Sequence, residues 1–252
     1  MFHLDIADGI ATLTLDRAPV NAINDAWVAG FHGELDRLDA AAGWNILHIR
    51  SALRLFSAGA DLKDMRARYA TAEGRAQFQQ GVRGMQKLFA RIEALERPTL
   101  AEINGAAMGG GFELALACTL RIAAAEAQVG LPEVRLGLLP GAGGTQRLTR
   151  LVGRAMAERL ILGAETVDGA TAERLGLVQW SAPAAELAAE AAAIAGRFAA
   201  LPVHAVAEAR ACIRAASMPG VDGYEREITG GAALLETAET RALVARFLDR
   251  KG

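Results

Sequence analysis

Two short segments carry the residues whose types and spacing could do chemistry. Phe56–Leu62 and Asn104–Glu113 each place a backbone N–H beside glycines, where a carbonyl oxygen could approach it closely. The second segment adds the carboxyl group of Glu113 one helical turn later, and Glu133 follows in the segment Gly130–Glu133. Two backbone donors and two acids suit proton chemistry next to a thioester carbonyl, with no need for a metal ion or a nucleophilic side chain.

The glycines Gly109–Gly111 follow a predicted strand and open a predicted helix. The first N–H groups of a helix lack partners and lie at the positive end of its dipole, so they could bind an oxygen atom. The same glycines could equally serve a tight turn that needs positive φ. A dinucleotide site is a weaker interpretation, because the glycine spacing after the first strand and the acid that should follow about 20 residues later are both absent.

The two glutamates and Ala60 each have a purely structural interpretation beside the chemical one. Glu113 lies among apolar residues and should be buried, either as an ion-pair or helix-dipole partner or as a carboxyl group with a tuned pKa. Glu133, taken alone, fits a solvated loop acid. Ala60 precedes Asp61, which is predicted to cap a helix, and a capping turn would also leave the Ala60 N–H exposed.

Pro140–Arg147 is rich in glycine but is not a phosphate loop, since the Gly-Lys-Ser/Thr ending is missing. We expect it to start a helix packed under the site, with Thr145 and Gln146 hydrogen-bonding the loop that carries Glu133. The four histidines show no metal-ligand spacing, and no Ser-His-Asp pattern is present, so no metal site is predicted.

Hydrophobic periodicity predicts the elements that must position these residues. Strands are predicted first and helices dominate after Ala182, which gives an α/β core over residues 1–195 with the chemical site and an all-helical region over 196–252 for packing and oligomerisation. The predicted strands are Ile10–Leu15, Asn45–Arg50, Pro98–Ile103 and Leu120–Ala123. The predicted helices are Asp25–Asp39, Ala72–Leu95, Phe112–Cys118, Ala184–Ala200, Val203–Ala216 and Ala238–Asp249.

Composition excludes several classes of protein. The 252 residues carry a net charge of −2, so no nucleic-acid or anionic membrane partner is indicated. No apolar run reaches the ~20 residues of a membrane span, and the N-terminus lacks the features of a secretory signal. Cys118 and Cys212 lie in apolar helical surroundings and are predicted to be buried free thiols, so a cytoplasmic location is expected.

At this point the sequence resembles the enoyl-CoA hydratase/isomerase family, the crotonase superfamily, over nearly its whole length. The resemblance rests on four ordered motifs: Arg17–Ala22, Phe56–Leu62, Arg97–Glu113 and Leu131–Leu148. It implies an α/β fold, a crotonase-like spiral of ββα units, followed by an all-helical C-terminal region. It also implies homotrimers, often paired into homohexamers.

The resemblance also implies roles for individual residues. The carbonyl oxygen of an acyl-CoA thioester would bind the N–H groups of Ala60 and Gly110, the oxyanion hole. Glu113 and Glu133 would be the catalytic residues, as in the hydratases of the family, which have both glutamates. Further contacts with the acyl-CoA are implied for the residues around them: Ala18, Val20, Ala22, Ala58, Asp61, Leu62, Gly109, Pro132 and Gly141.

The expected function is therefore that of an enoyl-CoA hydratase, which adds water reversibly to a 2-enoyl-CoA thioester. No cofactor is expected, because coenzyme A is part of the substrate. Acyl-chain selectivity should depend on Met65–Gln80 and on Leu136–Leu139. Two alternatives stay open: a Δ3-Δ2 enoyl-CoA isomerase or another acyl-CoA lyase of the family, and a non-catalytic acyl-CoA-binding subunit, which loss of either glutamate would have favoured.

Overall fold

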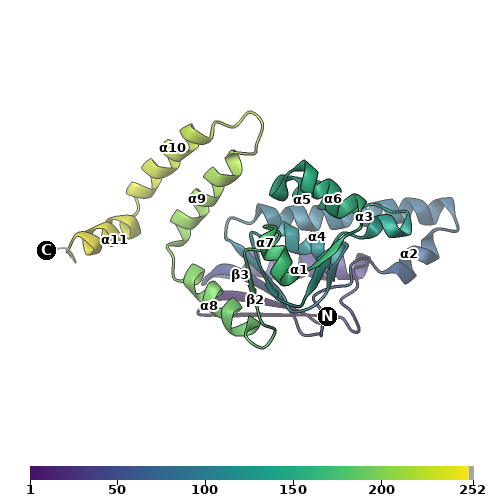
Figure 1. Cartoon of the computed structure of the whole chain (residues 1–252). Coiled ribbons are helices and arrows are strands. Elements are labelled where there is room, and N and C mark those ends of the chain that lie inside the picture. Colours follow the sequence, from purple (N-terminus) through teal and green to yellow (C-terminus); the bar gives the residue numbers. More distant parts are fainter. Residues whose placement is uncertain (250–252) are drawn as a thin grey trace.

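The computed structural model describes residues 1–249 and shows a mixed α/β core from which three C-terminal helices project (Figure 1). A six-stranded sheet has the order β1-β2-β3-β4-β6-β9, and a three-stranded sheet has the order β5-β7-β8. β1 and β2 form an antiparallel hairpin, and the strands from β2 to β9 in the large sheet pair in parallel. The strands are β1 Phe2–Ala7, β2 Gly9–Leu15, β3 Trp44–Ser51, β4 Thr99–Ile103, β5 Ala107–Met108, β6 Leu120–Ala124, β7 Gln128–Gly130, β8 Thr166–Asp168 and β9 Trp180–Ala182.

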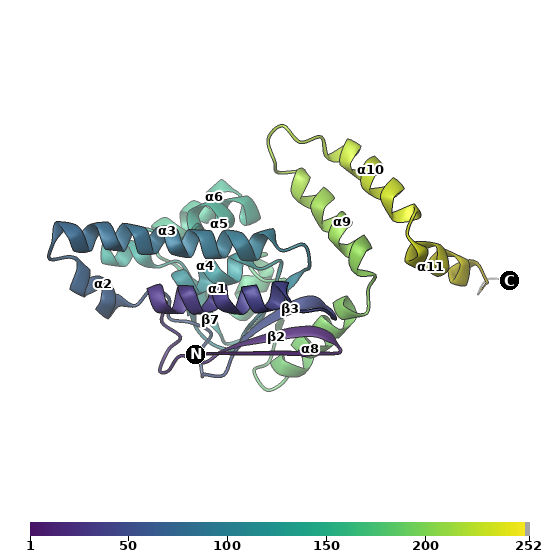
Figure 2. The same cartoon turned by 180° about the vertical axis from the view of Figure 1, so that it is seen from behind.

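Helices cover both faces of the large sheet, α8 on one face and α1, α3 and α4 on the other (Figures 1 and 2). None of the helices within residues 1–249 has both the length and the hydropathy needed to cross a membrane. The helices are α1 Asp25–Asp39, α2 Leu62–Arg68, α3 Ala72–Ala94, α4 Gly110–Ala117, the 3-10 helix η1 Glu133–Leu136, α5 Gly144–Val152, α6 Arg154–Leu162, α7 Gly169–Arg174, α8 Leu187–Ala199, α9 Val203–Ala215, α10 Gly223–Leu235 and α11 Ala238–Asp249.

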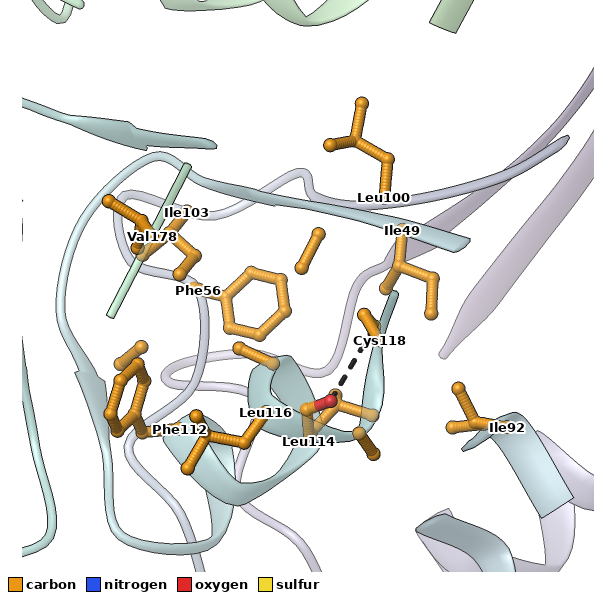
Figure 3. Packing of buried hydrophobic residues seen from close by; sticks show 14 of the residues in the cluster. Ile49, Phe56, Ile92, Leu100, Ile103, Phe112, Leu114, Leu116, Cys118 and Val178 are labelled. Carbon is orange, nitrogen blue, oxygen red and sulfur yellow. Dashed lines mark hydrogen bonds between the residues drawn. The ribbon is translucent and has the colours of Figure 1, made fainter. Parts of the chain in front are cut away.

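The core lies between the large sheet and α4, and it fixes the helix that carries Glu113. Every residue of α4 is buried. Figure 3 shows Phe56 among side chains from α4 and from β4, with the Cys118 thiol donating to the Leu114 carbonyl oxygen at 3.5 Å. Fully burying one large apolar side chain is worth about 1.5–3 kcal/mol, so this packing holds the start of α4 firmly in place.

The predicted strands and helices agree with the structure within two residues at every end but one. The structure adds β1, the short strands β5 and β7–β9, the 3-10 helix η1 and the helices α6, α7 and α10. The predicted helix Ala184–Ala200 begins only at Leu187. Cys118 is buried as expected, but Cys212 is only half-buried, because its segment of α9 projects from the core instead of packing within it.

In the described part of the C-terminal region, up to residue 249, every regular element is a helix, as predicted, but the first of these helices belongs with the core. α8 buries Leu187, Ala191, Ile194 and Ala195 against the sheet. The predicted boundary at residue 195 falls inside this helix, and the projecting part begins after Ala199. A division of the chain into two domains stays a prediction.

Candidate active site

Two backbone N–H groups lie next to each other on one side of a cavity. Ile23 N–H donates to the Gly59 carbonyl, and Asp61 N–H donates to the Ile23 carbonyl, at 2.8 and 2.9 Å. Peptide groups in extended chain alternate in direction, so the intervening Ala60 N–H points away from Ile23. Gly110 is the first residue of α4, where an N–H has no partner within the helix.

Glycine lets these two donors approach each other. A Cβ atom on Gly59 would lie 2.6 Å from the Met108 carbonyl oxygen and 3.0 Å from the Gly110 nitrogen, and Gly59 has φ +87°. Only glycine tolerates both the contact and that φ. Within residues 1–249, neither the Ala60 nor the Gly110 N–H donates a hydrogen bond. Both are therefore available to one oxygen atom.

Glu113 is 2% exposed and is held by backbone groups of the glycine-rich loop before α5. Its Oε1 atom accepts hydrogen bonds from the N–H groups of Ala142 at 2.8 Å and Gly144 at 2.7 Å. Burial raises the pKa of Glu113 to about 7, and the Glu133 carboxylate acts in the same direction, while the two N–H groups and Arg147 oppose the rise. A carboxyl group with this pKa can exchange a proton near neutral pH.

Glu133 begins η1 and reaches over the glycine turn. A Cβ atom on Gly109 would lie 2.8 Å from Glu133 Oε1. The Oε2 atom is buried and has no hydrogen-bond partner within residues 1–249. Burial raises the pKa of this carboxyl group as well. An unpartnered buried carboxyl oxygen is costly, which is typical of a group that meets a ligand.

The predicted role of Pro140–Arg147 is partly wrong. The segment does start a helix under the site, but Gln146 donates to the Thr145 hydroxyl, and neither of the two hydrogen-bonds the loop of Glu133. The segment instead binds Glu113 through main-chain N–H groups. The sequence showed no sign of this, because main-chain donors leave no residue-type signature.

A cavity of about 780 Å³ brings the predicted residues together. Ala60, Gly110, Glu113 and Glu133 all line it, as do five predicted contact residues: Ala58, Leu62, Gly109, Pro132 and Gly141. Its walls are mainly apolar and include side chains from both segments that were expected to determine acyl selectivity: Met65, Phe78, Gln79, Leu136, Leu138 and Leu139. α3 adds further lining residues: Val82, Arg83, Met85 and Gln86.

Four predicted contact residues, Ala18, Val20, Ala22 and Asp61, lie outside this lining. Val20 and Asp61 instead support the loop of Ala60. The Val20 carbonyl accepts from the Ala58 N–H at 3.0 Å, and Asp61 caps α2 through the N–H groups of Lys63 and Asp64. A contact of these four residues with a ligand stays a prediction.

Sequence analysis missed the polar side chains that brace the Ala60 loop. The amide of Asn21, which is fully buried, donates to the Ser51 hydroxyl and the Phe56 carbonyl, at 2.8 and 3.0 Å. Arg17 pairs with Asp61 at 3.1 Å. Both missed residues lie within the motif Arg17–Ala22, where a buried asparagine in a loop was the available signal. Within residues 1–249, no group of three or more His, Cys, Asp or Glu side chains could hold a metal ion.

Comparison with known proteins agrees with this geometry. The family model "Enoyl-CoA hydratase/isomerase" matches residues 5–251. The chain is 41% identical over 191 residues to "Probable enoyl-CoA hydratase" of Bacillus subtilis, covering 75% of this chain and 72% of that protein. It is 38% identical over 199 residues to "Short-chain-enoyl-CoA hydratase" of Clostridium acetobutylicum, covering 78% and 74% of the two chains.

Solved structures share this fold over nearly the full length of the chain. The crystal structure of an enoyl-CoA hydratase from Bacillus anthracis superposes with a TM-score of 0.91 at 31% identity, covering 99% of this chain and 96% of that one. The fold and these similarities define an enzyme of the crotonase superfamily. Within that superfamily, the chain belongs to the enoyl-CoA hydratase/isomerase family.

Proposed function

We propose that this protein is an enoyl-CoA hydratase that adds water reversibly to a 2-enoyl-CoA thioester. One observation carries the proposal: both glutamates, Glu113 and Glu133, line the same cavity as the two free N–H groups of Ala60 and Gly110. The hydratase names of the relatives support it. The reaction needs no cofactor, since coenzyme A arrives with the substrate.

The N–H groups of Ala60 and Gly110 would bind the thioester carbonyl oxygen. Attack of water on the conjugated double bond moves negative charge onto that oxygen. Two fixed donors in a site that excludes water stabilise this charge without reorganising, and each is typically worth about 10²–10³ in turnover. The apolar walls would hold the acyl chain so that its double bond lies near the carboxyl groups.

The two carboxyl groups would handle the protons. Burial raises the pKa of both carboxyl groups, and the Glu133 carboxylate raises that of Glu113 further, so both groups are suited to proton exchange. Glu113 is the proposed base: its Oε1 atom is fixed by two N–H donors, which leaves Oε2 to take a proton from water. Glu133 is the proposed acid that protonates the α-carbon.

The proposed function includes a homotrimer or a homohexamer. α9–α11 project from the core (Figure 2), and their apolar side chains are exposed, among them Ile213 at 74%, Ile228 at 66% and Leu235 at 64%. An exposed apolar surface of this extent is typical of a protein–protein interface. We propose that neighbouring copies of the chain pack against it.

The test is a panel of 2-enoyl-CoA thioesters of different chain length. Hydration removes the conjugated absorbance and gives a 3-hydroxyacyl-CoA, which mass spectrometry identifies by a gain of one water. Conversion of a 3-enoyl-CoA into a 2-enoyl-CoA, with no hydration of any thioester in the panel, would contradict the hydratase proposal and identify the protein as an isomerase.

A further inference from the structure

The loop Pro140–Gly144 holds Glu113, and the structure shows what holds the loop. Three of its five residues are glycines, which give it little rigidity of its own. Glu113 nevertheless takes two short hydrogen bonds from it, at Ala142 and Gly144. The orientation of the carboxyl group therefore depends on contacts that fix this loop from outside.

Those contacts come from α3 and from the first turns of α5. The Gln86 amide donates to the Gly141 carbonyl at 2.7 Å. The guanidinium of Arg147 donates to the Ala142 carbonyl at 3.0 Å and, through Nε and Nη2, to Glu93 Oε2 at 3.0 and 2.9 Å. Ala142 is thus bound on both sides, with its N–H on Glu113 and its carbonyl on Arg147.

The guanidinium of Arg147 packs directly against the backbone of Gly143. Gly143 has φ +105°, and a Cβ atom on it would lie 2.2 Å from Arg147 Nη1 and 3.2 Å from Cζ. No side chain can stand at residue 143 while Arg147 keeps its place. The Arg147 side chain is 9% exposed, so water competes little for its hydrogen bonds.

We propose that Glu93 and Arg147 are a positioning pair: Glu93 orients the guanidinium, and the guanidinium holds the Ala142 peptide so that the loop presents two N–H groups to Glu113. Neither residue lines the cavity. The role of Glu113 as the base rests on the proposed function, but the geometry of the pair does not.

The pair also sets the electrostatics of Glu113. The charged groups that act on Glu113 are Glu133 from η1, which raises its pKa, and Arg147 from α5, which lowers it. Loss of Arg147 removes a positive charge and the side-chain hydrogen bond that holds Ala142. Both losses disfavour the Glu113 carboxylate, so both shift the pKa of Glu113 upward.

The test measures this pKa in the full-length protein without substrate. Glutamate labelled with ¹³C at the side-chain carboxyl reports each titration by NMR, and the Glu113 signal is identified by its absence in Glu113→Gln. Arg147→Gln should raise the pKa of Glu113, because the lost guanidinium both lowers this pKa and holds Ala142 in place. Glu93→Gln keeps the arginine and should give a smaller rise.

Arg150→Gln is the matched control. Arg150 lies on the same helix and also faces Glu93, at 3.8 Å, but it is 59% exposed and makes no bond to the loop. The control should leave the pKa of Glu113 unchanged. An unchanged pKa in both Arg147→Gln and Glu93→Gln, or an equal rise in the Arg150→Gln control, overturns the proposal. If Arg147→Gln does not fold, Glu93→Gln against the control decides in the same way.

Turnover separates this inference from the proposed function. With crotonyl-CoA, the acidic limb of the rate profile should move to higher pH in Arg147→Gln, in step with the NMR pKa. If the protein hydrates no enoyl-CoA but the variants show the NMR shift, the positioning pair is supported and the hydratase proposal is contradicted. If the protein hydrates crotonyl-CoA but the variants change neither the pKa of Glu113 nor the acidic limb, the hydratase proposal is supported and the positioning pair is contradicted.

Discussion

Arg17 and Asp61 form an ion pair, with 3.1 Å between Nη2 and Oδ2, that joins the motif Arg17–Ala22 to the loop that carries Ala60. Arg17 also donates to the Ala22 carbonyl, and Asp61 caps α2. Burial alone would raise the pKa of Asp61, but the Arg17 guanidinium and the capping N–H groups outweigh burial and lower it. The pair therefore fixes the backbone that carries one of the two free N–H groups.

Breaking this pair should weaken the binding of the carbonyl oxygen in the transition state. We expect Arg17→Gln to lower kcat/KM for a 2-enoyl-CoA by about tenfold, less than the ~10²–10³ for losing a donor outright, because Ala60 keeps its N–H but loses its fixed direction. Steady-state kinetics measure the effect. Arg154→Gln, on a surface arginine that is 85% exposed, is the control and should match the wild type.

Gly110 allows a direct test of its N–H. Proline is tolerated at the first position of a helix, so Gly110→Pro removes the donor at limited cost to α4. Turnover should fall by at least about 10²-fold. Gly110→Ala is the matched control: its Cβ atom would lie 3.5 Å from the Ala60 nitrogen, an ordinary contact, and the N–H remains. Equal turnover in the two variants would contradict the assignment of the Gly110 N–H to the oxyanion hole.

The raised pKa of Glu113 makes stability depend on pH with a definite sign. The folded protein binds this proton more tightly than the unfolded chain, whose glutamates titrate near 4.5. The stabilisation is fully present below pH 4.5 and is lost as pH rises through about 7. Glu113→Gln should therefore melt at a higher temperature than the wild type at pH 8, and the difference should shrink toward pH 4.5. Thermal melts at both values measure it, and an equal difference at both contradicts the assignment.

Candidate site residues could be proposed from the sequence where residue type carries the signal. Glu113 and the glycine turn stood out because a carboxyl group and three consecutive glycines are unusual at the start of an apolar helix, whereas Glu133 was selected only through its proximity to them in the motif pattern. The hairpin of β1 and β2 was missed although Asp8-Gly9, both with positive φ, is a strong hairpin turn signal. α10 was missed because Gly230 and Gly231 lower its helix propensity, while the Asp222 cap and tertiary packing on α9 favour the helix.

The contacts that organise the site could not be predicted from a single sequence. Glu93 and Arg147 lie 54 positions apart, and the donors to Glu113 are main-chain groups about 30 positions away. Nothing in residue type or local spacing links such partners. Only the folded chain, with α3 packed against α4, brings them within hydrogen-bond distance.

The projecting helices lead to a prediction about assembly. Light scattering at micromolar concentration should give the mass of three or six chains. Ile228→Glu places a charge on α10 at a residue that is 66% exposed, so the single chain should still fold, and the complex should dissociate or weaken. Arg241→Glu changes an exposed polar residue of α11 and should have a smaller effect. A stable monomer in the wild type would exclude the assembly.

The two carboxyl groups separate hydration from double-bond isomerisation. Glu113→Gln and Glu133→Gln keep shape and hydrogen bonding but remove a proton acceptor or donor. If water activation and α-carbon protonation are both required, each change should lower hydration of crotonyl-CoA by about 10²–10⁴-fold. The double variant should be scarcely slower than the slower single variant, because the effects of substituting groups that act as a unit do not add. Binding of crotonyl-CoA should survive in all three variants, since the proposed site for the carbonyl oxygen is the N–H groups of Ala60 and Gly110. An isomerase would depend strongly on one glutamate and little on the other, and full hydration by Glu113→Gln would end the two-carboxylate mechanism.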